Sequence, residues 1–209
     1  MGIETHVLTL ETLDGVRLEA DLVRPPNACV AAVLCHPHPL FGGERTNAVV
    51  DGVFRHLIAI GAAVLRFDFR GAGGSEGDHG GGIDERIDVS AAVDTLSSVT
   101  DAPLWIIGYS FGASVALDVA HPRADGWVGI APPLAAMSGP RVAGTDHRPK
   151  HLLVPAHDQY SPPEQTAAAV ADWPATTVEV IEGADHFLNG HLQHVAVRVA
   201  ALIGAPAAM

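Results

Sequence analysis

The chain has 209 residues, of which 48% are hydrophobic and 17% are charged. This length and composition fit one α/β domain over residues 1–209 and exclude a disordered chain. The formal net charge of −12 repels nucleic acid phosphates and anionic lipid head groups, so we expect neither a nucleic acid nor a membrane as a partner.

The chain shows no signal for export or membrane insertion. No apolar run reaches the length of a transmembrane helix, and the amino-terminal segment lacks the basic and apolar regions of a signal peptide. Cys29 and Cys35 lie on one apolar run and cannot pair within one strand, so we expect two buried free thiols. These features together favour a cytoplasmic protein.

Taken in chain order, the hydrophobic pattern predicts an opening hairpin followed by strands that mostly alternate with helices. Asp14 and Gly15 form the hairpin turn, and the continuous apolar run 28–35 is typical of a strand buried on both faces. Strands are expected at 5–13, 16–24, 28–35, 62–69, 103–110, 126–133, 151–158 and 176–183. Helices are expected from Thr46 or Asn47 to Gly61, and over 84–99, 111–120, 162–173 and 191–204. The fold class is therefore α/β, with a mostly parallel sheet covered by helices on both faces.

A nucleophile is predicted between the strand at 103–110 and the helix that follows it. The stretch "GYSFG", 108–112, matches G-x-S-x-G and stands where a tight strand–helix turn can present Ser110 at the carboxyl edge of the sheet. Gly108 and Gly112 would allow neighbouring backbone to pass closely, and the Phe111 N–H would point toward a developing oxyanion. The pattern predicts a nucleophile elbow.

A serine hydroxyl needs a base, which this kind of elbow finds after later strands, in the order acid and then histidine. Asp158 follows the strand at 151–158 and His186 follows the last strand. Asp185 competes for the acid role, but it directly precedes His186 and its side chain should diverge from the ring. We therefore expect Ser110 as nucleophile, His186 as base and Asp158 as the residue that orients His186.

The chain resembles the α/β-hydrolase superfamily over essentially its full length, and within it the small lidless bacterial serine hydrolases with an H-P-x-x-x-x-G-G stretch. The stretches that carry this resemblance are "HPHPLFGG", "DFRGAGGSEG", "GYSFG", "DQYSPP" and "GADHF". One departure is Pro155, which stands three residues before the acid where family members usually have glycine.

The histidines in "LCHPHPLFGG" belong to the loop that supplies a second oxyanion donor in this fold. Proline has no N–H, so His36, His38 and Leu40 are the possible backbone donors. The resemblance implies His38, with Leu40 as the alternative, and we expect His36 to have a structural role, packed behind the loop and bonded to backbone. A metal site at this histidine pair is the rival interpretation; the flanking prolines argue against it, and we expect neither a metal nor another cofactor.

The connection between the strands near Pro133 and His151 is too short for a cap domain, so we expect an open site for small or flexible acyl esters. Residues expected to line it are Leu40, Phe41, Tyr109, Leu134, Met137, Tyr160 and Phe187. We predict a carboxylesterase whose partner is a small-molecule ester. Three alternatives stay open: a serine peptidase or amidase resembling the Xaa-Pro peptidases, a non-catalytic binding protein of the same fold, and a metallohydrolase. The sequence leaves the oligomeric state open, a homodimer being one option.

Overall fold

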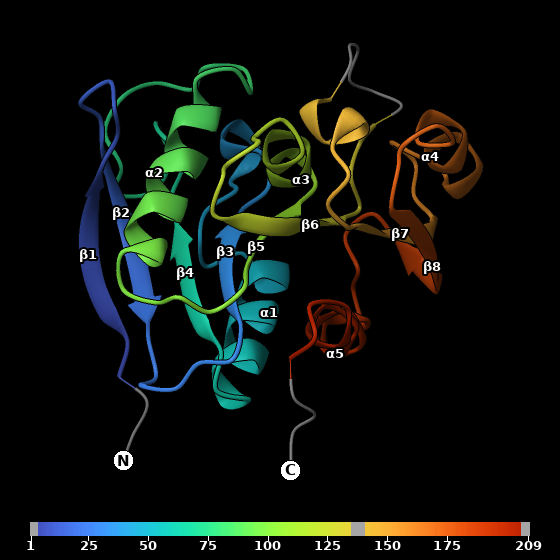
Figure 1. Cartoon of the computed structure of the whole chain (residues 1–209). Coiled ribbons are helices and arrows are strands. Elements are labelled where there is room, and N and C mark those ends of the chain that lie inside the picture. The colour runs from blue at the N-terminus through green and yellow to red at the C-terminus, as the bar shows by residue number, and fades with distance from the viewer. Residues whose placement is uncertain (1–3, 135–140, 206–209) are drawn as a thin grey trace.

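The computed structural model describes residues 4–134 and 141–205. Eight strands form one sheet in the order β1-β2-β4-β3-β5-β6-β7-β8 (Figure 1). The strands are β1 (His6–Glu11), β2 (Arg17–Val23), β3 (Ala31–Cys35), β4 (Ala63–Phe67), β5 (Leu104–Tyr109), β6 (Ala124–Ile130), β7 (Lys150–His157) and β8 (Thr176–Asp185). Only β2 is antiparallel to its neighbours β1 and β4, and every pair from β4 to β8 is parallel. The predicted fold class is confirmed.

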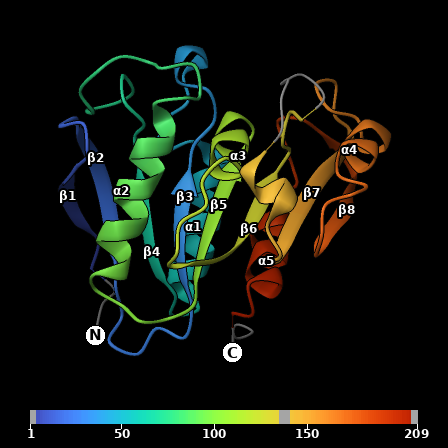
Figure 2. The ribbon, with the colours of Figure 1, turned by 45° about the horizontal axis from the view of Figure 1, so that its top comes forward.

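Helices cover both faces of the sheet. Their bounds are α1 (Ala48–Ala59), α2 (Glu85–Ser97), α3 (Phe111–Ala116), α4 (Pro163–Ala169) and α5 (Leu192–Leu202). Helices α1 and α5 pack on one face, and α2, α3 and α4 lie on the other (Figure 2). Every residue of β3, β4 and β5 is buried, because these central strands have a helical layer on each side.

The residues predicted to begin and end α1 have the expected structure. The side chain of Asn47 accepts a hydrogen bond from the Val49 N–H at 3.0 Å and so begins the helix. Gly61, two residues past its end, has φ of +81°. Helices α3 and α4 are shorter than predicted. Each ends several residues before the apolar pattern of its segment ends.

One expectation about the cysteines is wrong. Cys35 is buried in β3, and burial raises the pKa of its thiol well above the usual range. Cys29 is free but exposed. It lies before β3, which begins at Ala31 and not at residue 28.

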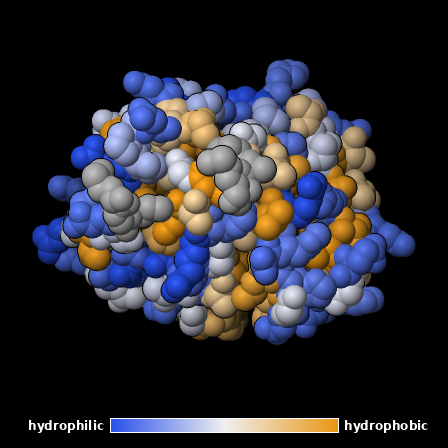
Figure 3. All heavy atoms as spheres, turned by 90° about the horizontal axis from the view of Figure 1, so that it is seen from below, coloured by the Kyte–Doolittle hydropathy of each residue, from blue (hydrophilic) through white to orange (hydrophobic). Residues whose placement is uncertain are grey.

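The parallel strands bring their carboxyl ends to one edge, where the connecting loops and the short 3₁₀ helix η1 (Pro39–Phe41) lie (Figure 1). The opposite face, at the amino ends of these strands, mixes hydrophilic residues with hydrophobic ones near its centre (Figure 3). Between β6 and β7 the described part of the connection, 131–134 and 141–149, contains the 3₁₀ helix η2 (Val142–Thr145) and no cap domain. No helix within 4–134 or 141–205 combines the length and the hydropathy needed to cross a membrane.

Candidate active site

The turn between β5 and α3 has the geometry expected of a nucleophile elbow. Ser110 has φ of +53° and ψ of −118°, a left-handed conformation that is strained for a residue with a side chain. A Cβ atom added to Gly108 would lie 2.3 Å from the Gly112 carbonyl oxygen. One added to Gly112 would lie 2.4 Å from the Cys35 carbonyl oxygen. Both glycines are therefore required by close backbone packing, and together they leave the Ser110 side chain projecting from the sheet edge.

Strand register brings the other two predicted residues to the same edge. His157, the last residue of β7, pairs with Asp185, the last residue of β8. Asp158 and His186 directly follow this pair, so their side chains emerge next to each other. The Oγ atom of Ser110 lies 2.9 Å from Nε2 of His186, and Nδ1 of His186 lies 2.8 Å from Oδ2 of Asp158. The structure thus brings Ser110, His186 and Asp158 into one hydrogen-bonded chain.

The Asp158 carboxylate is completely buried and has partners at both oxygens. Its Oδ1 accepts hydrogen bonds from the N–H groups of Tyr160 at 2.8 Å and Ser161 at 3.1 Å, while Oδ2 faces His186. A buried carboxylate needs such donors to remain ionised. These bonds also fix the side chain, so that Oδ2 holds the His186 ring in one orientation.

Asp185 points elsewhere, as the sequence suggested. Its side chain is exposed and accepts a hydrogen bond from the Phe187 N–H at 3.0 Å. This bond stabilises the turn after β8, and within the described residues Asp185 forms no hydrogen bond or ion pair with the His186 ring.

Tyr109 fixes the main chain of the His186 loop. Its hydroxyl donates a hydrogen bond to the His186 carbonyl oxygen at 2.9 Å. Burial, reinforced by the negative charges of Asp158 and Asp185, raises the pKa of Tyr109 well above its usual range. The phenol therefore stays protonated and remains a donor at neutral pH.

The loop after β3 separates the roles of its two histidines. His36 is fully buried: its Nε2 accepts a hydrogen bond from the Phe69 N–H at 2.9 Å, and its Nδ1 lies 2.6 Å from the Pro37 carbonyl oxygen. Burial lowers the pKa of His36 to about 4, so the ring is neutral near pH 7. With both nitrogens committed to backbone, His36 has no lone pair left for a metal, and its role is structural.

The possible backbone donors of this loop differ in their availability. The Leu40 N–H donates to Nδ1 of His38 at 3.2 Å. Neither the His38 N–H nor the Phe111 N–H donates to any group in the described part of the chain. These two groups are therefore free to donate to a bound ligand.

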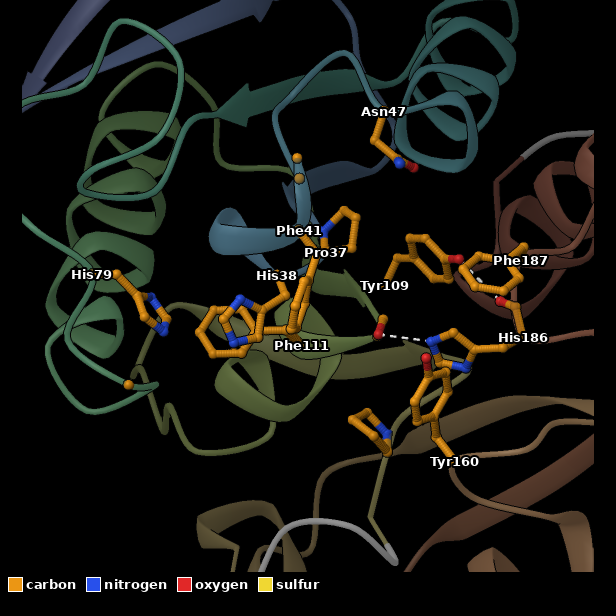
Figure 4. A pocket seen from close by; sticks show the side chains of 15 residues that line it. Pro37, His38, Phe41, Asn47, His79, Tyr109, Phe111, Tyr160, His186 and Phe187 are labelled. Atoms are coloured by element: carbon orange, nitrogen blue, oxygen red, sulfur yellow. Dashed lines mark hydrogen bonds between the residues drawn. The ribbon is translucent and has the colours of Figure 1, made fainter.

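A pocket of about 630 Å³ opens beside Ser110 (Figure 4). Four of the predicted lining residues do line it: Phe41, Tyr109, Tyr160 and Phe187. Two do not: Leu40 points away and is 70% exposed because η1 turns it outward, and Leu134 is buried in the core. Met137 lies outside the described residues.

Several lining residues are not predicted as such by the sequence, and of these His79 and Asn47 carry polar side chains. His79 belongs to the glycine-rich loop between β4 and α2, which has no apolar periodicity to place it. Asn47 was expected only as a helix cap. The one signal that could have found His79 is its position in a loop that leaves the carboxyl end of a parallel strand, where α/β folds bind ligands.

No metal centre is evident in the described ranges. They contain no group of three or more histidine, cysteine or acidic side chains placed to hold an ion. His191 and His194 lie at the start of α5, the latter on its exposed side, and neither lines the pocket.

Comparisons with known proteins agree with this architecture. The family model described as serine aminopeptidase, S33, matches residues 32–152. An α/β serine hydrolase homologue from Coxiella burnetii is 28% identical, with a TM-score of 0.81 and coverage of 96% of this chain and 97% of that chain. A lidless α/β serine hydrolase from Xanthomonas campestris is also 28% identical, with a TM-score of 0.74 and coverage of 95% and 96%.

A curated relative matches a smaller part of the chain. An uncharacterised protein from Rickettsia prowazekii (strain Madrid E) is 40% identical over 113 residues, which cover 52% of this chain. The match spans about half of that relative, 47% of its length. The family match extends from β3 into β7 and includes the Ser110 elbow, and the chain therefore belongs to the serine aminopeptidase S33 family of α/β hydrolases.

Proposed function

We propose that the chain is a serine carboxylesterase that cleaves small or flexible acyl esters through an acyl-enzyme on Ser110. The observation that carries this proposal is the hydrogen-bonded chain from Ser110 Oγ through the His186 ring to Asp158, with distances of 2.9 and 2.8 Å. In the first step His186 Nε2 takes the hydroxyl proton as Oγ attacks the ester carbonyl carbon. The same proton then passes to the alkoxy oxygen as the bond between carbonyl carbon and that oxygen breaks. Water, deprotonated by His186, then attacks the acyl carbonyl carbon; the bond from that carbon to Oγ breaks, His186 returns the proton to Oγ, and the acid is released.

Asp158 has two roles in this mechanism. Its carboxylate keeps the proton of the neutral ring on Nδ1, so that Nε2 presents a lone pair to Ser110. It also stabilises the imidazolium that forms during each step. The buried position of Asp158 and its two backbone donors support these roles.

The oxyanion is stabilised by the N–H groups of Phe111 and His38. Both are unpaired within the described residues, whereas the Leu40 N–H is already used by the His38 ring. This difference favours His38 over Leu40 as the second donor. Fixed donors aimed at developing charge contribute strongly to catalysis, because they need no reorganisation during the reaction.

The family's description favours a second function, that of an aminopeptidase. Such an enzyme must hold the α-ammonium group of its substrate, a task suited to a carboxylate in the pocket. No aspartate or glutamate lines the pocket among the described residues. The apolar lining by Phe41, Tyr109, Tyr160 and Phe187 supports ester substrates with apolar parts instead.

A fluorophosphonate probe tests the serine mechanism directly. Wild-type protein should be labelled at Ser110 in intact-protein mass spectra, and Ser110→Ala should remain unlabelled. Absence of labelling in the wild type would favour a non-catalytic binding protein or a metallohydrolase. Turnover of p-nitrophenyl butyrate compared with amino-acid p-nitroanilides then separates an esterase from a peptidase, because we expect the ester to react and the anilides to remain intact.

A further inference from the structure

The wall of the pocket that faces His186 contains two histidine rings which the proposed mechanism does not use. Figure 4 shows His186 with Phe187 and Tyr160 on one side of the pocket, and His38, Phe111 and His79 on the other. The rings of His38 and His79 lie 4.7 Å apart between centroids, and each also packs against Phe111. The two histidines therefore form one surface, although they come from different loops.

The position of the leaving alcohol assigns this surface to the acyl part of the substrate. His186 must hand its proton to the alkoxy oxygen, so the alcohol part of the ester lies beside His186. The remaining substituent of the carbonyl carbon has to extend to the other side. It then runs along Phe111 toward His38 and His79.

The neighbour of Nδ1 in each ring determines what the other ring nitrogen can offer. Nδ1 of His38 accepts from the Leu40 N–H, so it carries no proton, and the neutral ring carries its proton on Nε2. Burial and the neighbouring His79 lower the pKa of His38, which favours this neutral form. His38 thus offers an N–H donor at Nε2.

Glu85 favours the opposite tautomer in His79, with the proton on Nδ1. Its Nδ1 lies 2.7 Å from Oε1 of Glu85 in a close, bent contact, and the Glu85 side chain is completely buried. A carboxylate only accepts, so Nδ1 carries the proton, and in the tautomer with its single proton on Nδ1 the Nε2 atom is an acceptor. Glu85 also accepts from the N–H groups of Gly80 at 2.8 Å and Gly82 at 2.7 Å, which fixes the loop that presents His79.

One donor and one acceptor on the same wall match a hydroxyl group, which both accepts and donates. Neither Nε2 atom has a hydrogen-bonding partner in the described residues, so both are available to a ligand. We infer that His38 and His79 bind a hydroxyl group on the acyl chain, and that the substrates are esters of hydroxy acids. This inference rests on the proposed function, because it takes the direction of the substrate from the Ser110 mechanism.

The test compares kcat/KM for pairs of p-nitrophenyl esters that differ by hydroxyl against methyl. The pairs are β-hydroxybutyrate with isovalerate and ω-hydroxyhexanoate with heptanoate, so that two positions of the hydroxyl are sampled. We expect the wild type to prefer the hydroxylated ester in at least one pair by about 3-fold or more, the effect of one or two net hydrogen bonds. In His79→Phe, which keeps a ring but removes the acceptor, this preference should be lost and the ratio should fall to about 1 or below.

Further variants and one further ester make the result specific. His79→Ala guards against an effect of the phenylalanine ring and should lower the same ratio. His194→Phe changes an exposed histidine of α5 that does not line the pocket, and it should keep the wild-type ratio. The methoxy counterpart of whichever hydroxy ester is preferred, β-methoxybutyrate or ω-methoxyhexanoate, accepts but cannot donate, so it should lose the preference.

Several outcomes would overturn the inference. These are equal rates within both pairs, an unchanged ratio in both His79 variants, or a methoxy ester that reacts as well as the hydroxy ester. Turnover retained by Ser110→Ala, or no turnover of any ester, would instead overturn the proposed function and the inference with it.

Discussion

Replacing Asp158 with asparagine separates the two acidic residues that the sequence places near His186. The side chain keeps its size, and its amide oxygen can still accept from the N–H groups of Tyr160 and Ser161. The amide NH₂ then faces Nδ1 of His186, 2.8 Å away in the native protein. Two donors cannot face each other, so the ring must move its proton to Nε2. That nitrogen can then no longer accept the Ser110 proton.

The size of the loss follows from two effects. The wrong tautomer blocks proton transfer, and the imidazolium loses its buried counter-charge. In serine protease triads the same change lowers kcat by about 10⁴. We expect a loss of about 10²–10⁴ here, which corresponds to about 3–5 kcal/mol of additional barrier.

Asp185→Asn is the matched control. Its amide oxygen can still accept from the Phe187 N–H, and the side chain is exposed, so kcat should change by less than about 5-fold. The assay is steady-state hydrolysis of p-nitrophenyl acetate or butyrate, with thermal melts to show that each variant is folded. If Asp185→Asn is the slow variant and Asp158→Asn keeps near-wild-type rates, the assignment of the acid is wrong.

Three further predictions concern metal, pH and packing. Dialysis against a strong chelator should leave ester hydrolysis unchanged, since both ring nitrogens of His36 are committed to backbone; loss of activity that zinc restores would contradict the serine mechanism. The unfolded chain takes up the His36 proton near pH 6.5 but the folded chain only near 4, so the unfolding free energy should fall by at most about 3 kcal/mol as pH drops through this window. Urea titrations at several pH values across this window should show that the unfolding free energy of His36→Gln depends less on pH than that of the wild type. An identical pH dependence would refute this account. Gly52→Ala should stabilise α1 by about 0.5–1 kcal/mol, because the added Cβ meets nothing closer than 3.8 Å. Gly112→Ala should destabilise by about 3 kcal/mol or more, because its Cβ would meet backbone at 2.4 Å; equal melting temperatures for the two variants would contradict this reading of the elbow.

Features of the fold that depend on local sequence were predictable. The apolar runs of β3 and β5, the Asn47 cap and the two glycines around Ser110 each specify their own geometry. Helix ends were less so, because α4 ends at Ala169 although apolar residues continue beyond it. The exposure of Cys29 was not predicted for a related reason. An apolar run does not show at which residue the strand begins to pair with its neighbours, and Cys29 precedes that residue.

The placement of the three linked residues was also predictable, because parallel strands bring their carboxyl ends to one edge. Ser110, Asp158 and His186 each directly follow a strand, so position in the chain implies position in space. The pocket wall does not follow from such a rule. Leu40 and Phe41 are neighbours in η1, yet only Phe41 lines the pocket, since one step around a 3₁₀ helix turns the side chain by about a third of a circle.

Charged side chains from other elements hold the glycine-rich loop, and they explain why its structure escaped prediction. At its start, Arg70 pairs with Asp88 at 2.7 Å and with Asp14 at 2.9 Å. At its end, Glu85 holds Gly80 and Gly82. Glycine makes a loop costly to order because the unfolded chain loses much conformational freedom, so these contacts must supply the order that the loop sequence lacks. The acids that supply it stand on α2 and in the opening hairpin, outside the loop itself. The position of His79 in the pocket is therefore a property of the assembled fold, which a linear pattern of residues does not reveal.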